Sequence, residues 1–407
     1  MSELLSLKEA SAKLSVSPET LRRWDRDGKL KAERDPVNNY RYYHQKELDL
    51  YVTNDNVKLD TIYPLNKYRS IELFAGAGGM ALGMEKAGFE HVLLNDFDRY
   101  ATETLKKNRP QWNVVHGDIA EIDFREYYAK VDLLTGGFPC QAFSYAGKKM
   151  GMEDTRGTLF YEFARALKES APKVFLAENV RGLLSHDNGR TLQTMVEVFE
   201  SMGYELLEPR VLKAIHYRVP QKRERLFIVG IKKEYASQVT FEWPKASSKV
   251  YTLKDALKKG ELFDTDVAVS EGQAYPEKKK KVLDLIPPGG YWRNLPVELQ
   301  KEYMMKSFYL GGGKTGIARR ISWDEACLTL TCSPAQKQTE RCHPEETRPF
   351  QVREYARIQT FPDEWIFEGS MTQQYKQIGN AVPMNLSFAL GTSLVALLNE
   401  IEGLNDA

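Results

Sequence analysis

The sequence predicts an α/β fold in which a mostly parallel sheet carries helices on both faces. Between residues 70 and 229, short apolar strands alternate with segments of helical periodicity. A glycine-rich turn at residues 75–79 (AGAGG) follows the first of these strands and opens a helix. Parallel strands need a crossover connection, usually a helix, so this alternation is typical of doubly wound sheets.

The chain has 407 residues, which exceeds the usual size of a single hydrophobic core. Changes in composition divide it into five segments. We expect a small helical unit at 1–52, a polar linker at 53–69, the α/β domain at 70–230, a loop-rich domain at 231–318, and a return at 319–407 that completes the α/β domain.

Composition indicates a cytoplasmic protein. The four cysteines have no framework spacing, which favours a reducing compartment. No run approaches the roughly 18–20 apolar residues of a membrane span, and the N-terminus lacks the features of a secretion signal. The net charge is +1, but residues 231–320 hold 17 Lys and Arg against 11 Asp and Glu. This local excess fits phosphate contact or a solvated face.

The first strand of the α/β domain is followed by residues that suit a nucleotide-type cofactor. Gly76 lies in the turn, and Asp96, twenty residues later, ends the second strand, where it can accept hydrogen bonds from ribose hydroxyls. The Gly-x-Gly-Gly spacing is not the full dinucleotide fingerprint, and a tight structural turn is the alternative. Phe74 before the glycines and Asp118 after a third strand favour S-adenosylmethionine, which needs no pyrophosphate cradle.

Cys140 lies in the segment GGFPCQ (136–141), directly after the apolar run 131–134. A strand that delivers a cysteine into a loop bounded by glycine and proline holds the thiol where a substrate can reach it. An unpaired cysteine is also commonly a small buried hydrophobe, so the other segments must decide between the two.

Four further polar residues should converge at the same sheet edge. Glu178 follows an apolar strand, Arg223 and Arg225 precede another, and Asn380 comes before the last helix. Taken singly, Glu178 could be a helix cap, the arginines a solvated turn, and Asn380 a capping residue.

The order of these segments resembles that of the DNA cytosine-5 methyltransferases, particularly the single-chain enzymes of bacterial restriction-modification systems. The resemblance runs over 70–230 and again over 319–398, and includes the run TLTCSP at 329–334. It implies a Rossmann-like sheet of the S-adenosylmethionine-dependent methyltransferases. It also implies that 231–318 is the target-recognition domain.

The resemblance assigns catalytic roles. It makes Cys140 the nucleophile that adds to carbon 6 of cytosine, because carbon 5 alone is too weak a nucleophile to take a methyl group. Glu178 would donate a proton to ring nitrogen 3, which requires a raised pKa. Arg223 and Arg225 would fix the base carbonyl and the adjoining phosphate.

The resemblance also implies a cofactor pocket. Asp96 stands where many members of the family have glutamate, and this shorter acid reaches less far towards the ribose. The residues implied to line the pocket are Phe74, Gly76, Gly78, Gly79, Asp96, Phe97, Asp118, Ile119, Leu159 and Asn380.

The implied substrate is double-stranded DNA. The target cytosine must be flipped out of the stack, and the loop at 141–157 would close over it. The resemblance further implies a specific DNA site and a monomeric enzyme without a membrane partner. A restriction-modification system, with a cognate endonuclease acting on the same site, is one context for such an enzyme, and an orphan methylase is the alternative.

The helical unit at 1–52 carries the signals of a winged helix-turn-helix. Ser6 and Glu9 fit a capping box, Pro18 occupies the first position of a second helix, and 40–43 fit a β-wing. This order resembles the DNA-binding domain of MerR-type regulators and excisionases. Arg22, Arg23 and Arg26 favour DNA contact over the alternative of a protein-docking domain.

Other functions compete with DNA methylation. A tRNA cytosine-5 methyltransferase shares the catalytic logic, but its Cys-Phe-Thr signature is absent. A transcription regulator with an inactive methylase body would not need the intact catalytic set, and a Rossmann oxidoreductase would not need the Pro-Cys-Gln loop. A metal site at Cys327, Cys332, Cys342 and His343 lacks a short Cys-x-x-Cys pair, so we expect no metal.

Overall fold

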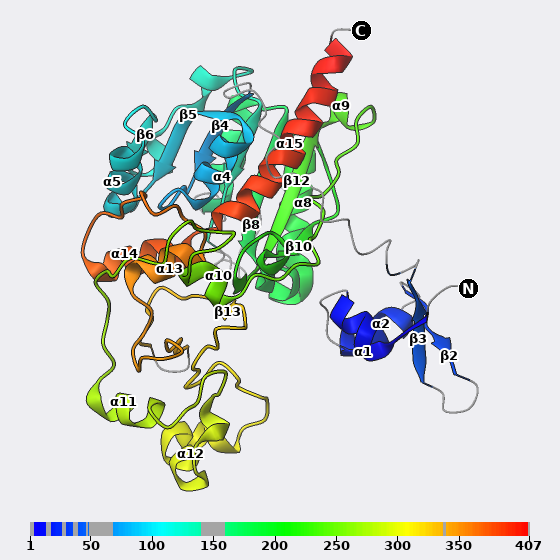
Figure 1. Ribbon diagram of the computed structural model, residues 1–407. Coiled ribbons are helices and arrows are strands. Elements are labelled where there is room, and N and C mark those ends of the chain that lie inside the picture. The colour runs from blue at the N-terminus through cyan, green and yellow to red at the C-terminus, as the bar shows by residue number, and fades with distance from the viewer. Residues whose placement is uncertain are drawn as a thin grey trace.

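The structure is a computed structural model (Figure 1). It describes residues 4–13, 18–26, 30–35, 40–45, 48, 68–139, 159–336 and 339–405.

An eight-stranded sheet forms the centre of the α/β domain and confirms the predicted fold class. Five of its strands are parallel, in the spatial order β6-β5-β4-β7-β8. Their bounds are β4 Tyr68–Leu73, β5 Phe89–Asp96, β6 Val114–His116, β7 Leu133–Gly136 and β8 Val174–Val180. The carboxyl ends of all five therefore meet at one edge of the sheet.

The sheet is not wholly parallel, because one strand, β12, runs antiparallel to this set, which the sequence did not reveal. β12 (Glu224–Lys232) pairs antiparallel with β8, and both β10 (Arg210–Lys213) and β9 (Tyr204–Leu206) pair with β12. The short connection between β10 and β12 allows the chain to turn back, whereas a parallel return would need a longer crossover. Arg225 is thereby brought opposite Val180 and close to Glu178.

Helices cover both faces of the sheet (Figure 1). The long helix α15 (Met384–Asn405) lies along α4 (Gly79–Ala87), and a Cβ atom at Gly83 would come 2.4 Å from Cβ of Ser387. Glycine at position 83 thus permits the close approach of the two helices. The other helices of the domain are α5 (Arg99–Asn108), α7 (Leu159–Ser170), α8 (Arg190–Ser201), α9 (Lys233–Ala236), α10 (Leu253–Leu257), α13 (Val352–Ile358) and α14 (Met371–Asn380).

One helical stretch of the described residues, Met371–Leu404, is long and apolar enough to cross a membrane by length and composition alone. Of its most apolar window, 67% is buried inside the protein. Leu386, Leu390, Leu394 and Leu398 of this stretch are buried in the core beneath the sheet. These features are those of a core helix.

A second, smaller hydrophobic cluster forms apart from the sheet. It joins Tyr275, Trp292 and Met304 to Ile317 and Cys342. Its helices are α11 (Glu277–Leu283) and α12 (Val297–Met304), which lie together at the bottom of Figure 1.

The segment before this cluster packs elsewhere. Phe241 and Trp243 contact the cluster that contains α15, and Leu253 and Leu257 belong to a cluster with Trp365. The small core therefore begins near Tyr275 rather than at residue 231, because the intervening chain carries apolar side chains that the α/β domain buries.

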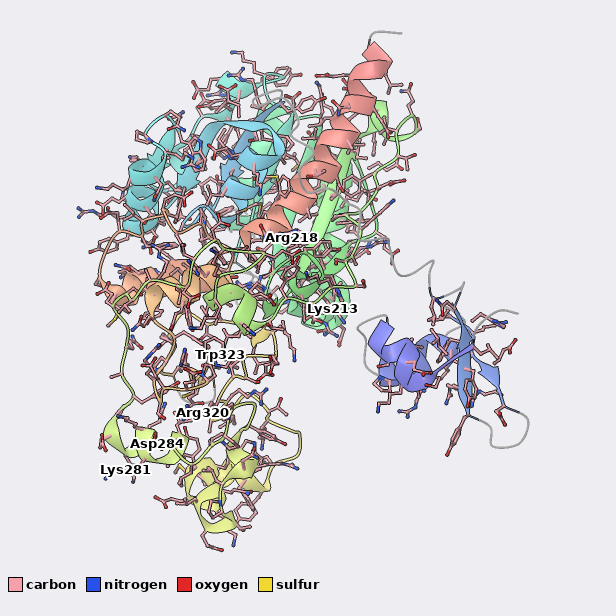
Figure 2. The ribbon with its side chains drawn as sticks, viewed as in Figure 1. Lys213, Arg218, Lys281, Asp284, Arg320 and Trp323 are labelled. Atoms are coloured by element: carbon pink, nitrogen blue, oxygen red, sulfur yellow. The ribbon has the colours of Figure 1, made fainter. Side chains whose placement is uncertain are left out.

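Arg320 ties the small cluster to the returning chain. Its buried guanidinium donates hydrogen bonds to the backbone carbonyls of Leu283, Ile286 and His343 at 2.7–2.9 Å. Figure 2 shows Arg320 between Trp323, nearer the α/β domain, and Lys281 and Asp284 around the end of α11. The two-stranded pair β11 (Gln221–Lys222) and β13 (Cys327–Leu328) joins the return to the segment just before β12.

The N-terminal unit contains the predicted elements. The capping box is confirmed, because Ser6 N donates to Glu9 Oε2 at 2.8 Å and Glu9 N donates to Ser6 Oγ at 3.4 Å. Asp25 accepts hydrogen bonds from Arg34 at 3.0 Å and Arg41 at 2.7 Å, which holds the wing to the second helix. The elements are β1 (Leu4–Ser6), α1 (Leu7–Lys13), α2 (Pro18–Arg26), β2 (Glu33–Arg34) and β3 (Arg41–His44), with β1 an additional strand that the sequence did not predict.

Candidate active site

The carboxyl edge of the parallel strands gathers most of the predicted site residues that the structure describes. Phe74 follows β4, Asp96 ends β5, Asp118 follows β6 and Glu178 lies near the end of β8. Chain segments far apart in sequence meet here because the strands are parallel and neighbouring. Cys140 follows β7, but residues 140–158, including the predicted loop, lie outside the described residues.

Glu178 and Arg225 form a close ion pair in the site. Oε1 of Glu178 lies 2.7 Å from Nε of Arg225, and the two side chains are only 12% and 14% exposed. Burial raises the pKa of Glu178 above its ordinary value, and the charges of Arg225 and Arg223 oppose this effect. The net upward direction of this pKa is the one that a proton donor requires.

Two residues to which the sequence gave no role hold this carboxyl and the chain that leads to Cys140. A Cβ atom at Gly137 would lie 2.7 Å from Oε2 of Glu178. Any side chain at position 137 would therefore displace this carboxyl. Asn179 is buried, and its Nδ2 donates to the carbonyl of Phe138 at 2.9 Å. A contact between β8 and the segment after β7 cannot be read from either segment alone.

We expect Gly137→Ala to lower kcat by about 10²-fold, because the added methyl group displaces the Glu178 carboxyl by a fraction of an ångström or more. The variant should still bind DNA, which a gel-shift titration would check. Gly403→Ala is a suitable control, since nothing lies within 4 Å of a Cβ atom at that position. A wild-type kcat for Gly137→Ala would contradict the inferred placement of Glu178.

Arg223 is placed differently from Arg225. It is 1% exposed, and its guanidinium donates to the carbonyls of Leu330 at 3.3 Å and Gly379 at 2.9 Å. These hydrogen bonds join the start of β12 to the returning chain. Arg223 thus braces the site, while Arg225 contacts the carboxyl of Glu178 directly.

The ends of β4 and β5 combine a carboxylate held by backbone hydrogen bonds with an exposed aromatic ring. Asp96 accepts hydrogen bonds from the backbone N–H groups of Gly76 and Asp98, both at 2.7 Å. The Phe97 ring is 75% exposed. Phe74 has a φ of 56°, a left-handed conformation that is uncommon for a bulky residue and often found at functional sites.

The glycines of this turn differ in their surroundings. Gly76 has a φ of 54° and nothing within 4 Å of a Cβ atom, so space is open beside it. A Cβ atom at Gly78 would meet Leu105 at 2.7 Å, and one at Gly79 would meet the carbonyl of Val382 at 2.2 Å. Gly78 and Gly79 therefore serve the packing of α4, and Gly76 borders free space.

The other predicted pocket residues lie around the same edge. Asp118 is exposed and caps the turn after β6 by accepting from Ala120 N at 3.0 Å. Ile119 is 3% exposed in the core cluster beneath, and Leu159 begins α7 beside that cluster. Asn380 is exposed at the end of α14, where its Oδ1 accepts a hydrogen bond from Cys332 Sγ at 2.9 Å.

This arrangement agrees with comparisons to known proteins. The model of the C-5 cytosine-specific DNA methylase family matches residues 68–396. The chain belongs to this family. A second model, that of the MerR family regulatory protein, matches residues 6–43 and supports the helix-turn-helix assignment.

Curated relatives match nearly the whole methylase. The chain is 63% identical to the Type II methyltransferase M.Eco47II of Escherichia coli over 98% of this chain and 97% of that one. It is 56% identical to the Type II methyltransferase M.PspPI of Psychrobacter sp. over 95% and 94% of the two chains. The solved structure of Spodoptera frugiperda DNMT2 has the same fold, with a TM-score of 0.59, 17% identity, and coverage of 81% of this chain and all of that one.

The chain is accordingly an enzyme, a cytosine-5 DNA methyltransferase of the type II class. The relatives support DNA over the tRNA alternative, since the high identity is to Type II methyltransferases. Within the part of the methylase that the structure describes, no three His, Cys, Asp or Glu side chains are grouped to hold a metal ion.

Proposed function

We propose that this methylase modifies a flipped cytosine in a specific duplex site through a transient covalent bond to Cys140. The observation that carries the proposal is the buried Glu178 carboxyl, which lies between Gly137 and Arg225 at the strand end next to the one that leads to Cys140. An acid at this place can protonate a base held against it.

The reaction follows from the properties of these groups. The Cys140 thiolate adds to carbon 6 of the cytosine, and the electron pair of the ring double bond moves towards nitrogen 3, which takes a proton from Glu178. Carbon 5 becomes the nucleophile of an enamine. After carbon 5 is methylated, a water molecule removes its proton, the ring expels the Cys140 thiolate, and nitrogen 3 returns its proton to Glu178.

The carboxyl edge of β4, β5 and β6 fits S-adenosylmethionine. The open space at Gly76, the exposed Phe97 ring and the fixed carboxylate of Asp96 offer room, a stacking surface and an acceptor for ribose hydroxyls. When bound, the cofactor supplies an electrophilic methyl group. Asp118 and Asn380 would hold its adenine and amino-acid ends.

Phe97→Ala is expected to weaken cofactor binding by about 10-fold, because a stacked aromatic contact contributes on the order of 1 kcal/mol beyond its buried area. Isothermal titration of the protein with S-adenosylhomocysteine measures this without any turnover. Phe388→Ala, which alters the packing of α15, is the control: it shows how far general destabilisation alone changes the affinity for S-adenosylhomocysteine. Equal affinity in wild type and Phe97→Ala would argue against the pocket.

We further propose that the methylase acts as a cytoplasmic monomer on chromosomal DNA, in partnership with an endonuclease that cuts the same site when it is unmethylated. Bisulfite sequencing of DNA from cells expressing the chain tests the function. We expect one sequence context to be protected at its target cytosine. Full conversion at every cytosine would contradict the proposal.

A further inference from the structure

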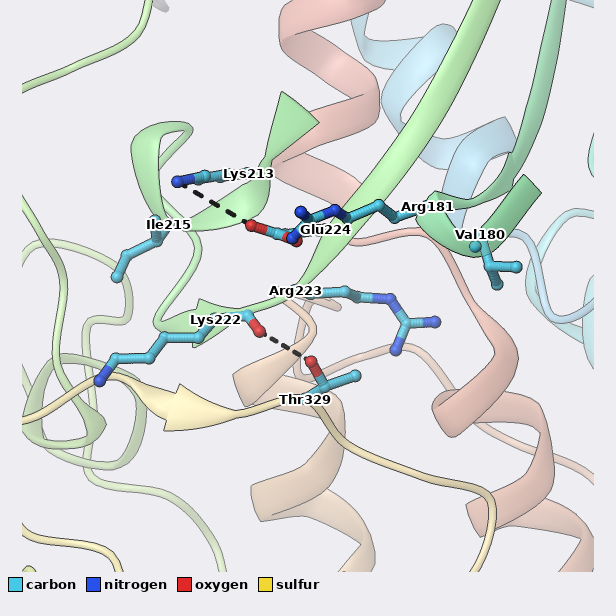
Figure 3. A pocket seen from close by; sticks show the side chains of 9 residues that line it. Val180, Arg181, Lys213, Ile215, Lys222, Arg223, Glu224 and Thr329 are labelled. Atoms are coloured by element: carbon cyan, nitrogen blue, oxygen red, sulfur yellow. Dashed lines mark hydrogen bonds and ion pairs between the residues drawn. The ribbon is translucent and has the colours of Figure 1, made fainter. Parts of the chain in front are cut away.

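A cavity of about 520 Å³ adjoins the Glu178–Arg225 pair and shares only Arg223 with the site described above (Figure 3). It opens at the end of β8 and the start of β12, where Val180 lies opposite Arg225. Val180 is two residues from Glu178 in β8, so the cavity adjoins the place where the reacting base must sit. Its size is within the usual range of ligand pockets.

The walls of the cavity carry an excess of positive charge. Arg181, Lys213, Lys222 and Arg223 line it, against the single carboxylate of Glu224. A concave site with walls of one sign of charge concentrates ligands of the opposite sign. The cavity is therefore suited to an anion.

Glu224 neutralises part of this charge. Its Oε2 lies 2.7 Å from Arg181 and its Oε1 lies 3.9 Å from Lys213, as Figure 3 shows for the lysine. The side chain of Lys213 is 43% exposed, and its ion pair is long, so a stronger anion can displace Glu224 from it. No carboxylate of the described residues lies within ion-pair distance of Lys222.

Arg223 adds a donor that the protein leaves unsatisfied. Its Nε is buried and has no hydrogen-bond partner among the described residues, while its terminal nitrogens are held by backbone carbonyls. Burial, with the nearby charge of Arg225, lowers the pKa of Arg223 to about 9. An anion in the cavity would offset the unfavourable burial of this charge.

The cavity also has an apolar part. Val180 is 47% exposed and Ile215 is partly exposed, and both line the cavity. An inorganic anion would leave these side chains in water. A sugar–phosphate unit offers carbon atoms to Val180 and Ile215 and an anionic group to the cations.

We propose that this cavity binds the sugar and phosphate of a nucleotide that flanks the target cytosine in the same DNA strand, with Lys213 as a phosphate ligand for which Glu224 competes. The inference rests on the proposed function, since it takes the flipped base to lie at Glu178. In the absence of DNA, the Glu224 carboxylate pairs with both Lys213 and Arg181, and a phosphate replaces it when DNA binds.

The test uses the full-length protein and a duplex containing the site mapped by bisulfite sequencing. For Lys213→Gln, we expect DNA affinity to fall about five-fold, and the slope of log K against log salt to decrease in magnitude by about 1. The single-turnover rate of methyl transfer at saturating DNA should be unchanged. Glu224→Gln should bind the duplex more tightly than wild type, because the competing carboxylate is gone.

Lys168→Gln is the matched control. Lys168 is exposed in the last turn of α7, at the sheet edge opposite the cavity, and the substitution removes the same charge. Equal affinities and salt slopes for Lys213→Gln and Lys168→Gln would overturn the inference. Thermal unfolding of both variants checks that neither is misfolded.

Duplexes with a neutral methylphosphonate at single positions identify the phosphate. At one position beside the target cytosine, the replacement should weaken binding by wild type and have no further effect in Lys213→Gln. Additive effects at every position would contradict a specific subsite. A wild-type protein that transfers no methyl group to the duplex would instead refute the proposed function.

Discussion

Replacement of Cys140 by serine is expected to lower methyl transfer by at least about 10³-fold. A serine hydroxyl is not ionised near neutral pH and is a harder nucleophile, so carbon 6 of the cytosine would not be attacked and carbon 5 would stay inactive. Transfer of a labelled methyl group from S-adenosylmethionine to a duplex with the mapped site measures the effect.

The same variant should bind the duplex with an affinity close to that of wild type. Cys342→Ala is the control for loss of a thiol, because Cys342 is buried in the small cluster and has no proposed catalytic role. Appreciable turnover by Cys140→Ser alongside normal turnover by the control would exclude the covalent mechanism.

Glu178→Gln is expected to reduce kcat by about 10²–10⁴-fold with a much smaller change in KM for DNA. Glutamine matches the shape of the carboxyl and can still donate a hydrogen bond, but it cannot transfer a proton to nitrogen 3. Steady-state kinetics at several DNA concentrations separates the two constants. A variant with wild-type kcat would contradict the role of Glu178 as an acid.

The pH dependence of the two proteins provides an independent check. Burial raises the pKa of Glu178 above its ordinary value of 4.5, and the protonated form is the active one. The wild-type kcat should therefore fall as pH rises through this raised pKa. Because a glutamine side chain does not titrate, the alkaline decrease should be absent from Glu178→Gln, and its persistence would assign the decrease to another group.

The sequence predicted the parallel core of the fold well, because its signals are local. Each strand from β4 to β8 is a short apolar run followed by a turn or helix start, and Asp96 and Glu178 mark strand ends. The antiparallel direction of β12 could not be predicted, since it depends on how β10 pairs with it. Pairing partners are set by tertiary packing rather than by local sequence.

The candidate site shows the same limit. The motifs predict Glu178 and Arg225 as site residues, but the buried position of Arg223 depends on the carbonyls of Leu330 and Gly379, which are 107 and 156 residues away in sequence. The requirement for glycine at Gly137 likewise appears only when Glu178 is in place. The burial of Arg223 and the requirement for glycine at position 137 both depend on contacts between segments that are far apart in the sequence.

The most direct measurement of the central claim is covalent trapping. The protein, S-adenosylmethionine and a duplex with 5-fluorocytosine at the mapped target position are incubated, and the product is digested and analysed by mass spectrometry. Fluorine at carbon 5 cannot be removed as a proton is, so elimination of the thiolate is blocked. The account predicts a stable adduct that joins the peptide containing Cys140 to the modified base. Methylation of the normal duplex with no adduct at Cys140 in the fluorinated one would contradict it.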